Sequence, residues 1–379
     1  MADKKTLQEL MKEINKSYGE QIISLGAELP EVKRIPFSSP RANYMTYGGI
    51  PRGRIIEFAG EEGSGKTTTA LDICANAMTV FQNEWQEEKD SLEQIEKPSK
   101  QQMLRLNELT SFGPKKILYA DLENTLDAEW CEKIGLDISE IYFYKAQGQN
   151  AEEIFEDIIK AIETEEIGLV VIDSLGVMVS AQAYEKSIEQ KTYGGISMAL
   201  TLFSKKANAV CKKNDCTLIG INQVRDNMNS PYGGISTPGG KAWKHNASLR
   251  IMFQKGDFVD SEGDKIARGS ESPAGNKVCM DIKKTKAFKP DRRLGYYTLM
   301  YDYGIDVLSD LVDMCVVEGV IQKGGAWFTF INPETGEVIT DECGSTLKVQ
   351  GRANVLKLLH DSEELRSIYQ KFVDNMIYG

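Results

Sequence analysis

Eight consecutive residues, Gly60 to Thr67, match the phosphate-binding pattern G-x-x-x-x-G-K-[ST] at every position. The glycines allow the backbone to curl, so that its N–H groups point toward phosphate oxygens. The ammonium group of Lys66 suits the β- and γ-phosphates, and the Thr67 hydroxyl is a ligand that Mg²⁺ accepts. The stretch therefore predicts a binding site for a nucleoside triphosphate.

The context of this loop agrees with that prediction. An apolar, strand-like run (Arg54–Ala59) precedes the loop, and apolar residues at helical spacing follow it from Thr68 to Val80. A helix that begins here adds the partial positive charge of its N-terminus to the phosphate site. A glycine turn before an ordinary helix is the alternative, which the complete match disfavours. The residues expected to bind ATP in this segment are Gly60, Glu61, Glu62, Gly63, Ser64, Gly65, Lys66, Thr67 and Thr68.

Two further apolar runs end in carboxylates. Gly168–Ile172 leads into Asp173, and a carboxylate so placed in a P-loop protein reaches the Mg²⁺ shell beside the loop. Lys116–Ala120 leads into Asp121 and then Glu123, either of which can orient or deprotonate the water that attacks the γ-phosphate. These two residues share one face if the strand continues, so their spacing leaves the choice open. A solvated strand end is the plainer alternative.

A third run, Thr217–Asn222, ends in Gln223, whose amide can hydrogen-bond the γ-phosphate. The following segment, 226–240, contains four glycines and two prolines, a composition typical of a mobile loop. It is flanked by cations for phosphates (Arg225, Lys241 and Lys244), and it contains apolar side chains that can wedge or stack between bases, as single-strand binding requires. A loop without a ligand is the alternative. The expected DNA-binding residues are Arg225, Met228, Tyr232, Ile235, Gly239, Gly240, Lys241 and Lys244.

Strand-like and helical patterns alternate through the middle of the chain, which predicts an α/β fold with a mostly parallel sheet. We expect a helix and strand arm over 1–36, an ATPase core over 37–303 and a small α/β domain over 304–379. Residues 84–115 form a charged helical insertion, either simply exposed or a protrusion that binds a partner. The expected core strands are Ile55–Ala59, Lys116–Ala120, Ile141–Tyr144, Gly168–Ile172, Thr217–Asn222, Ala247–Phe253, Val278–Lys283 and Tyr297–Tyr301.

The bulk composition excludes several classes of protein. The formal net charge of −11 means that DNA contact requires a local basic surface. Seven scattered cysteines without a C-x-x-C pair, and only two histidines, argue against a zinc cluster or a disulfide framework. No apolar run has the length of a membrane span, and the charged N-terminus lacks a signal-type core. We therefore expect a cytoplasmic protein without membrane contact.

Beyond these single motifs, the chain resembles the bacterial RecA strand-exchange recombinases and their phage relatives over nearly its whole length. The resemblance implies a RecA-like P-loop ATPase core with the two flanking parts described above. The segments that carry it are Gly53–Glu57, Gly60–Thr67, Asp121–Asp127, Val171–Ser174, Ile221–Arg225, Gly239–Ala242, Ala247–Arg250, Lys284–Pro290, Gly325–Trp327 and Gly351–Asn354.

The resemblance also implies roles for individual residues. Glu123 would activate water, and Gln223 would sense the γ-phosphate and pass its state to the DNA loop. Met228 would wedge between bases. Lys284 and Lys286, otherwise a solvated basic turn, would reach the γ-phosphate bound by the neighbouring subunit. The further residues implied are Asp127 and Trp130 at the adenine, with Tyr301 also in the ATP site; Lys66 as a catalytic cation; and Thr67 and Asp173 at the metal.

The implied function is a DNA-dependent ATPase that uses ATP and Mg²⁺. It would form helical filaments on single-stranded DNA and exchange strands with homologous double-stranded DNA, in a bacterial cytoplasm or, if phage-encoded, in that of the host. Recombination mediators or single-strand-binding proteins are further expected partners. The alternatives are a ring-forming helicase or recombination-accessory ATPase of the same fold, a non-hydrolysing scaffold and a small-molecule kinase. The sequence departs from the family pattern at the 84–115 insertion, in the poorly aligned 181–195 loop and at His245.

Overall fold

The structure is a computed structural model that describes residues 6–18, 23, 31–184, 195–226, 235–267, 272–341 and 343–379. The chain divides into two compact units, Met1–Lys33 and Arg34–Gly379. The smaller unit contains α1 (Leu7–Tyr18), a helix within the range 1–36 where a helix and a strand are expected. No helix in the described part of the chain is long and apolar enough to span a membrane.

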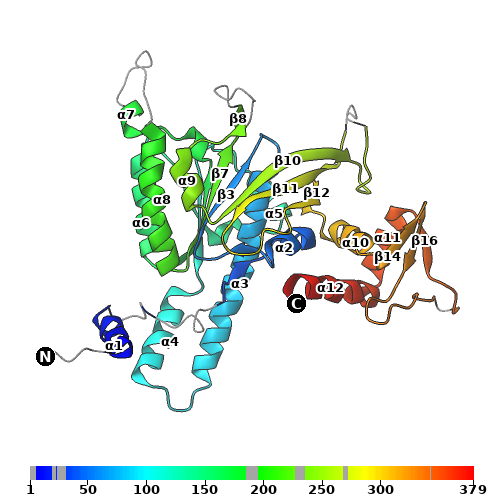
Figure 1. The fold of residues 1–379 in the computed structure, drawn as a ribbon, viewed down its shortest axis with the longest axis horizontal. Coiled ribbons are helices and arrows are strands. Elements are labelled where there is room, and N and C mark those ends of the chain that lie inside the picture. Colours follow the sequence, from blue (N-terminus) through cyan, green and yellow to red (C-terminus); the bar gives the residue numbers. More distant parts are fainter. Residues whose placement is uncertain are drawn as a thin grey trace. The chain divides into compact units, whose positions relative to one another are not determined.

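The larger unit is built on a nine-stranded sheet in the order β13-β12-β11-β10-β3-β7-β6-β4-β5 (Figure 1). Six neighbouring strands, from β10 to β5, pair in parallel, and the other three pair antiparallel. All eight expected strands lie in this sheet, so the predicted fold class is confirmed. The strands are β3 (Ile55–Gly60), β4 (Lys116–Asp121), β5 (Ile141–Tyr144), β6 (Ile167–Asp173), β7 (Thr217–Gln223), β10 (Leu249–Val259), β11 (Gly275–Thr285), β12 (Leu294–Met300) and β13 (Gly304–Ile305).

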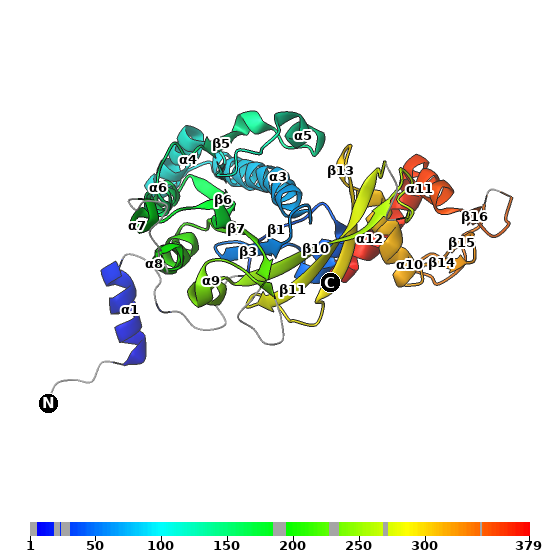
Figure 2. The same ribbon diagram turned by 90° about the horizontal axis from the view of Figure 1, so that it is seen from above.

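Helices cover both faces of the parallel part of the sheet, because its strands are apolar on both sides. On β4, Tyr119 packs into the cluster formed with α3, while Leu118 and Ala120 pack into the cluster formed with α6 and α8. Figure 2 shows β6 and β7 between α3 and α8. The helices are α2 (Pro40–Thr46), α3 (Lys66–Glu93), α4 (Lys100–Phe112), α5 (Ala128–Lys133), α6 (Ala151–Glu163), α7 (Ala181–Tyr184), α8 (Gly195–Lys213) and α9 (Gly240–Asn246), with 3₁₀ turns at Ile138–Glu140 and Leu175–Val177.

The helix after the phosphate loop is longer than its expected extent, Thr68–Val80. α3 continues without a break to Glu93 and carries the first part of the charged insertion, residues 84–93. α4 runs back beside α3 after a turn. Ser99 caps its N-terminus in a capping box with Gln102, and Gly113, whose φ is 70°, caps its C-terminus. The two helices form a helical hairpin, which projects at the end of the sheet opposite to α7 and β8 (Figure 1).

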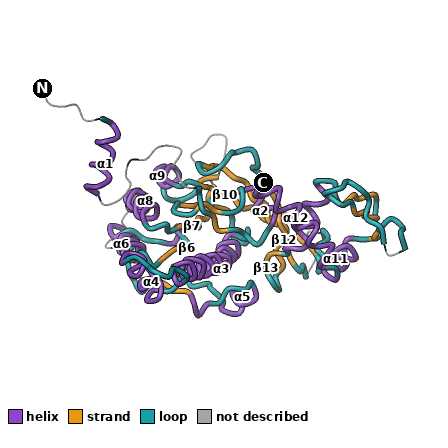
Figure 3. The backbone as a smooth tube through the Cα atoms, turned by 90° about the horizontal axis from the view of Figure 1, so that it is seen from below, coloured by secondary structure: helices purple, strands orange, loops and turns teal. Residues whose placement is uncertain are grey.

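Residues after the sheet form their own apolar cluster, in which Phe330, Val355 and Tyr369 are buried. Figure 3 shows α11 and α12 on the side of the sheet where β12 and β13 lie, and Figure 1 shows α10 between β12 and α11. The proposed division at residue 303 stays a prediction. The elements here are α10 (Val307–Val317), β14 (Ile321–Gly324), β15 (Trp327–Phe330), β16 (Lys348–Gln350), α11 (Arg352–Asp361) and α12 (Glu363–Tyr378). Two small ladders complete the fold: β1 (Arg34–Ile35) with β2 (Ile50–Pro51), and β8 (Arg225–Asp226) with β9 (Ile235–Ser236).

A buried carboxylate joins α10 to α2. Asp310 accepts hydrogen bonds from the Ser39 hydroxyl and, at 2.9 Å, from the Arg41 backbone N–H. Burial raises the pKa of Asp310 from 3.8 to about 6. The native state therefore holds an extra proton between these values, and the free energy of unfolding falls as the pH rises through that window.

We expect the stability advantage of the wild type over Asp310→Asn to shrink as the pH rises from about 4 to about 7, because the amide cannot ionise. The change should be on the order of 2 kcal/mol, as follows from a shift of about two pKa units. Urea unfolding of both proteins across this range measures it. An advantage that is independent of pH would contradict the titration of Asp310.

Candidate functional site

The phosphate loop lies between the end of β3 and the start of α3. Gly65 caps the helix with a φ of 92°, a left-handed conformation that favours glycine, and a Cβ there would lie 3.0 Å from Val278. Lys66 is buried, and its Nζ donates to the Glu61 carbonyl at 2.6 Å and to Ser64 Oγ at 3.5 Å. Desolvation lowers the pKa of Lys66, while Asp173 and Glu123 oppose that shift.

A cavity of about 320 Å³ opens beside this loop. Trp130 and Tyr301, both expected at the nucleotide, lie on its wall. Asp127, expected at the adenine, is not among its lining residues in the described part of the chain, and its carboxylate instead caps α5 through the Glu129 N–H at 3.0 Å. The lining residues are Gly63, Ser64, Gly65, Lys66, Thr67, Thr68, Trp130, Lys255, Asn276, Leu299 and Tyr301.

The carboxylate at the end of β6 faces the loop. Asp173 Oδ2 accepts hydrogen bonds from the Thr67 hydroxyl at 2.8 Å and from the Tyr119 hydroxyl at 2.9 Å. Burial raises the pKa of Asp173, although these two hydrogen bonds favour its ionised form. The structure thus brings together the two residues expected at the metal, and the hydrogen bond from Tyr119 fixes the orientation of the Asp173 carboxylate.

The two acids that follow β4 have different surroundings. Asp121 is buried, and its two oxygens accept the backbone N–H groups of Thr125 and Leu126 at 3.3 and 3.2 Å. Glu123 is half-buried, and its Oε1 accepts the Ser174 hydroxyl and, at 3.2 Å, the Gln223 amide. Asp121 therefore shapes the turn, whereas Glu123 faces the residue expected to sense the γ-phosphate.

The segment expected to bind DNA begins at Arg225, two residues after Gln223. β8 and β9 pair across its base, with Arg225 opposite Ser236 and Asp226 opposite Ile235. The Asn222 amide donates to the Pro238 carbonyl at 3.3 Å, so both ends of the segment are tied to the end of β7.

The loop tip and the start of α9 complete that segment. Met228 and Tyr232 lie outside the described residues, as do residues 185–194 of the other expected DNA loop. α9 begins at Gly240 after Gly239, whose φ is 97°. Lys241 and Lys244 lie on this helix, Lys241 exposed and Lys244 half-buried.

Lys284 and Lys286 lie at the end of β11 and just beyond it. Lys284 Nζ donates to the carbonyls of Lys244 and His245 at 2.7 Å each, and Lys286 Nζ donates to the His245 carbonyl at 2.9 Å. Burial and the nearby Lys286 and Arg250 lower the pKa of Lys284 to about 8. Within the described residues, neither lysine lines the cavity at the phosphate loop of its own chain.

Sequence reasoning did not find several residues that organise this site, among them Tyr119, Ser174, Lys255 and Asn276. Nor did it find Glu57, which is fully buried in β3, pairs with Arg250 and accepts the Asn222 amide at 2.8 Å. A signal for Glu57 was present, because a carboxylate inside an apolar strand requires a buried partner. The partners themselves lie far away in the chain.

A model of the RecA N-terminal domain matches residues 5–83 and 104–306. The chain is 27% identical over 369 residues to Protein RecA of Mycoplasma mycoides subsp. mycoides, covering 96% of this chain and 90% of that protein. It is 29% identical over 339 residues to Protein RecA of Ruminococcus albus, covering 88% and 74% of the two chains. It is 28% identical over 338 residues to Protein RecA of Thermus aquaticus, covering 88% and 87%. Because the family match spans well over half of its length, the chain belongs to the RecA family of recombinases, which are DNA-dependent ATPases.

Proposed function

We propose that the chain binds ATP with Mg²⁺ at Gly60–Thr67, assembles into helical filaments on single-stranded DNA and pairs that strand with homologous duplex. The observation that carries this proposal is the contact of Glu123 with Gln223, the last residue of β7. Two residues later, β8 begins the segment expected to bind DNA. A movement of Gln223 at the phosphate site can therefore be transmitted to that segment through the single residue that separates β7 from β8. A ring-forming helicase is not favoured, because the relatives that match most of the chain are RecA proteins.

In the proposed hydrolysis, Glu123 takes the proton of the water that attacks the γ-phosphate, and ADP and phosphate are released. Lys66 exchanges its bond with the Glu61 carbonyl for the phosphate oxygens, whose developing charge it stabilises. Gln223 turns from Glu123 to the γ-phosphate while that group is present. After hydrolysis the Gln223 side chain would turn back to Glu123 and move β8. The affinity for DNA would then depend on whether ATP or ADP is bound.

The oxygens of Thr67 and Asp173 fit a magnesium ion. A hydroxyl and a carboxylate that converge within 2.8 Å are hard oxygen donors, which Mg²⁺ prefers together with phosphate oxygens and water. Burial disfavours the charged form of Asp173, and a cation would stabilise it. When bound, the ion would neutralise phosphate charge. Tyr119 would keep the carboxylate directed at the site, as outer hydrogen bonds do for metal ligands.

We place the protein in a bacterial cytoplasm, including that of a host if it is phage-encoded. All seven cysteines are free, and six of them are buried, which suits a reducing compartment. Recombination mediators and single-strand-binding proteins are the further partners we propose, because a filament on single-stranded DNA must replace proteins that already cover the strand.

The test of this function is ATP hydrolysis with and without single-stranded DNA, combined with electron microscopy of the same mixtures. We expect the rate to rise on adding DNA and helical filaments to form with ATP. Steep loss of DNA binding with added salt should accompany both results, since phosphate contacts dominate such binding. Closed rings, or a rate that is indifferent to DNA, would refute the filament proposal.

Lys284 offers a test of the subunit interface. If it reaches the neighbour's γ-phosphate, a Lys284→Ala subunit can still bind ATP, and a Lys66→Ala subunit can still donate Lys284. We expect mixtures of the two variants to hydrolyse ATP several-fold faster than either variant alone, as shared active sites allow. A mixture whose rate is the sum of its separate components would show that Lys284 does not act across an interface.

A further inference from the structure

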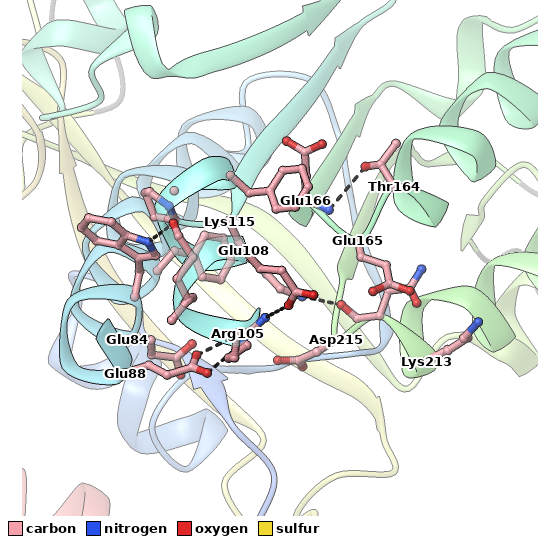
Figure 4. Close-up of a pocket in the computed structure, with 17 residues that line it drawn as sticks. Glu84, Glu88, Arg105, Glu108, Lys115, Thr164, Glu165, Glu166, Lys213 and Asp215 are labelled. Carbon is pink, nitrogen blue, oxygen red and sulfur yellow. Dashed lines mark hydrogen bonds and ion pairs between the residues drawn. The ribbon is translucent and has the colours of Figure 1, made fainter. Parts of the chain in front are cut away.

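The helical hairpin of α3 and α4 encloses a cavity of about 560 Å³ against the core (Figure 4). Residues 84–103 of this hairpin lie outside the ranges that the family model matches. The core side of the cavity consists of the segments that lead into β4, β6 and β7, whereas the phosphate loop follows the opposite end of the parallel β3. The cavity is therefore separate from the ATP site and from the proposed DNA-binding segment.

Aromatic and aliphatic side chains form one wall. Phe81 and Trp85 on α3 face Leu109 and Phe112 on α4, each pair at a helical spacing that places it on one side of its helix. Phe81 and Leu109 are buried, and the Trp85 indole N–H donates to the Leu109 carbonyl at 2.8 Å, which fixes the two helices together. Phe112 remains 56% exposed, so the wall offers apolar surface to a ligand.

Most of the remaining lining residues are charged, and the acids among them outnumber the bases. Arg105 forms ion pairs with Glu88 at 2.7 Å and with Glu108 at 3.4 Å, and both acids belong to the helical hairpin. Lys115 donates to the Asn214 carbonyl, and desolvation lowers its pKa. Figure 4 shows acidic side chains coming from the hairpin on one side and from the core loops on the other. Arg52, which lies behind the lining, pairs with Glu84 at 2.7 Å and with Asp215 at 2.5 Å, so Glu165 and Glu166 are the acids of the lining that form no ion pair among the described residues. The acids are Glu84, Glu88, Glu108, Glu165, Glu166 and Asp215, and the bases are Arg105, Lys115 and Lys213.

One buried acceptor in this lining has no donor. Asn214 is only 8% exposed, and its Nδ2 donates to the Ile162 carbonyl at 2.8 Å. Among the described residues, no hydrogen-bond partner reaches its Oδ1. Buried polar atoms without partners are uncommon and costly. This oxygen has almost no accessible surface, so it belongs to the floor of the cavity and is not a contact for a ligand.

We infer that the cavity docks a basic amphipathic segment of a partner protein. Lysine or arginine side chains of the partner meet Glu165 and Glu166, and apolar side chains cover Phe112 and the part of Trp85 that remains exposed. This is recognition of an amphipathic helix by a groove, with charge complementarity at its rim. The excess of carboxylates repels nucleic-acid phosphates, which disfavours DNA or RNA as the occupant.

The probe is a fluorescein-labelled helical peptide of about twelve residues with Lys and Leu at helical spacing. Two matched peptides replace every Lys by Glu or every Leu by Ser. We expect saturable binding of the Lys/Leu peptide to the full chain, measured by fluorescence anisotropy, and at least about tenfold weaker binding of both matched peptides. Equal binding of the three peptides, or none at all, would overturn the inference.

Two variants test whether the Lys/Leu peptide binds in this cavity. The double change Glu165→Lys and Glu166→Lys should weaken the Lys/Leu peptide about tenfold, and Phe112→Ser should weaken it several-fold. The matched control is Glu334→Lys with Glu337→Lys, which changes the net charge equally at two exposed positions of the C-terminal part. It should leave the affinity within about twofold.

Two further outcomes would count against the inference. Equal weakening by the control and by the double change in the cavity would show general attraction to an acidic chain and overturn the inference. Displacement of the peptide from the cavity by a single-stranded oligonucleotide would assign the site to nucleic acid instead. DNA-stimulated ATP hydrolysis should stay unchanged in all these variants, which shows that they fold and that the cavity acts independently of the proposed function.

Discussion

Replacing Glu123 by glutamine is expected to slow ATP hydrolysis by a factor of about 10²–10⁴ while ATP binding persists. Glutamine keeps an oxygen that accepts the hydrogen bonds of Ser174 and Gln223, so the local geometry is retained. It cannot take a proton from the attacking water. Single-turnover hydrolysis measures the loss, and filaments on single-stranded DNA should outlast those of the wild type because they remain in the ATP-bound state.

The control for this variant is Asp121→Asn. Asp121 accepts two backbone N–H groups of its own turn, and asparagine retains one of these acceptors. We expect hydrolysis to fall by less than about threefold, through small movements of the turn. If Asp121→Asn abolished hydrolysis and Glu123→Gln did not, Asp121 would be the base.

Replacing Lys66 by alanine is expected to reduce DNA-stimulated hydrolysis by a factor of about 10²–10³, because it removes a cation directed at the transferring phosphate. ATP affinity should fall as well, since the ammonium contributes to binding before the reaction. Filament formation that requires ATP should fail. The measurements are hydrolysis, binding of a fluorescent ATP analogue, and electron microscopy on single-stranded DNA.

Lys255 provides the matched control in the same cavity. It comes from β10, and its Nζ lies 4.6 Å from the centroid of the Phe258 ring. Because it lies outside the loop, Lys255→Ala should raise KM a few-fold and leave kcat nearly unchanged. Equal losses in the two variants would mean that any cation in the cavity suffices, which would contradict the role given to Lys66.

The strands and the phosphate loop could be predicted because they depend on local pattern. Apolar runs of four to seven residues located all eight expected strands. The helical hairpin was harder to predict. α3 runs on through charged residues to Glu93, since Trp85 and Leu109 give it a partner in α4. Local propensity alone does not indicate where such a helix ends.

The sequence by itself determined that a triphosphate site exists and that acids gather around it, because parallel strands present their carboxyl ends at one edge of a sheet. Only the tertiary structure decided which partner each acid contacts. Gln223 contacts Glu123 across 100 residues of chain, and Thr67 contacts Asp173 across 106. The same holds for Lys284, which reaches the carbonyls at the end of α9 some 40 residues away. Spacing cannot encode such pairings, because they arise only when packing of the sheet and helices brings distant strand ends together.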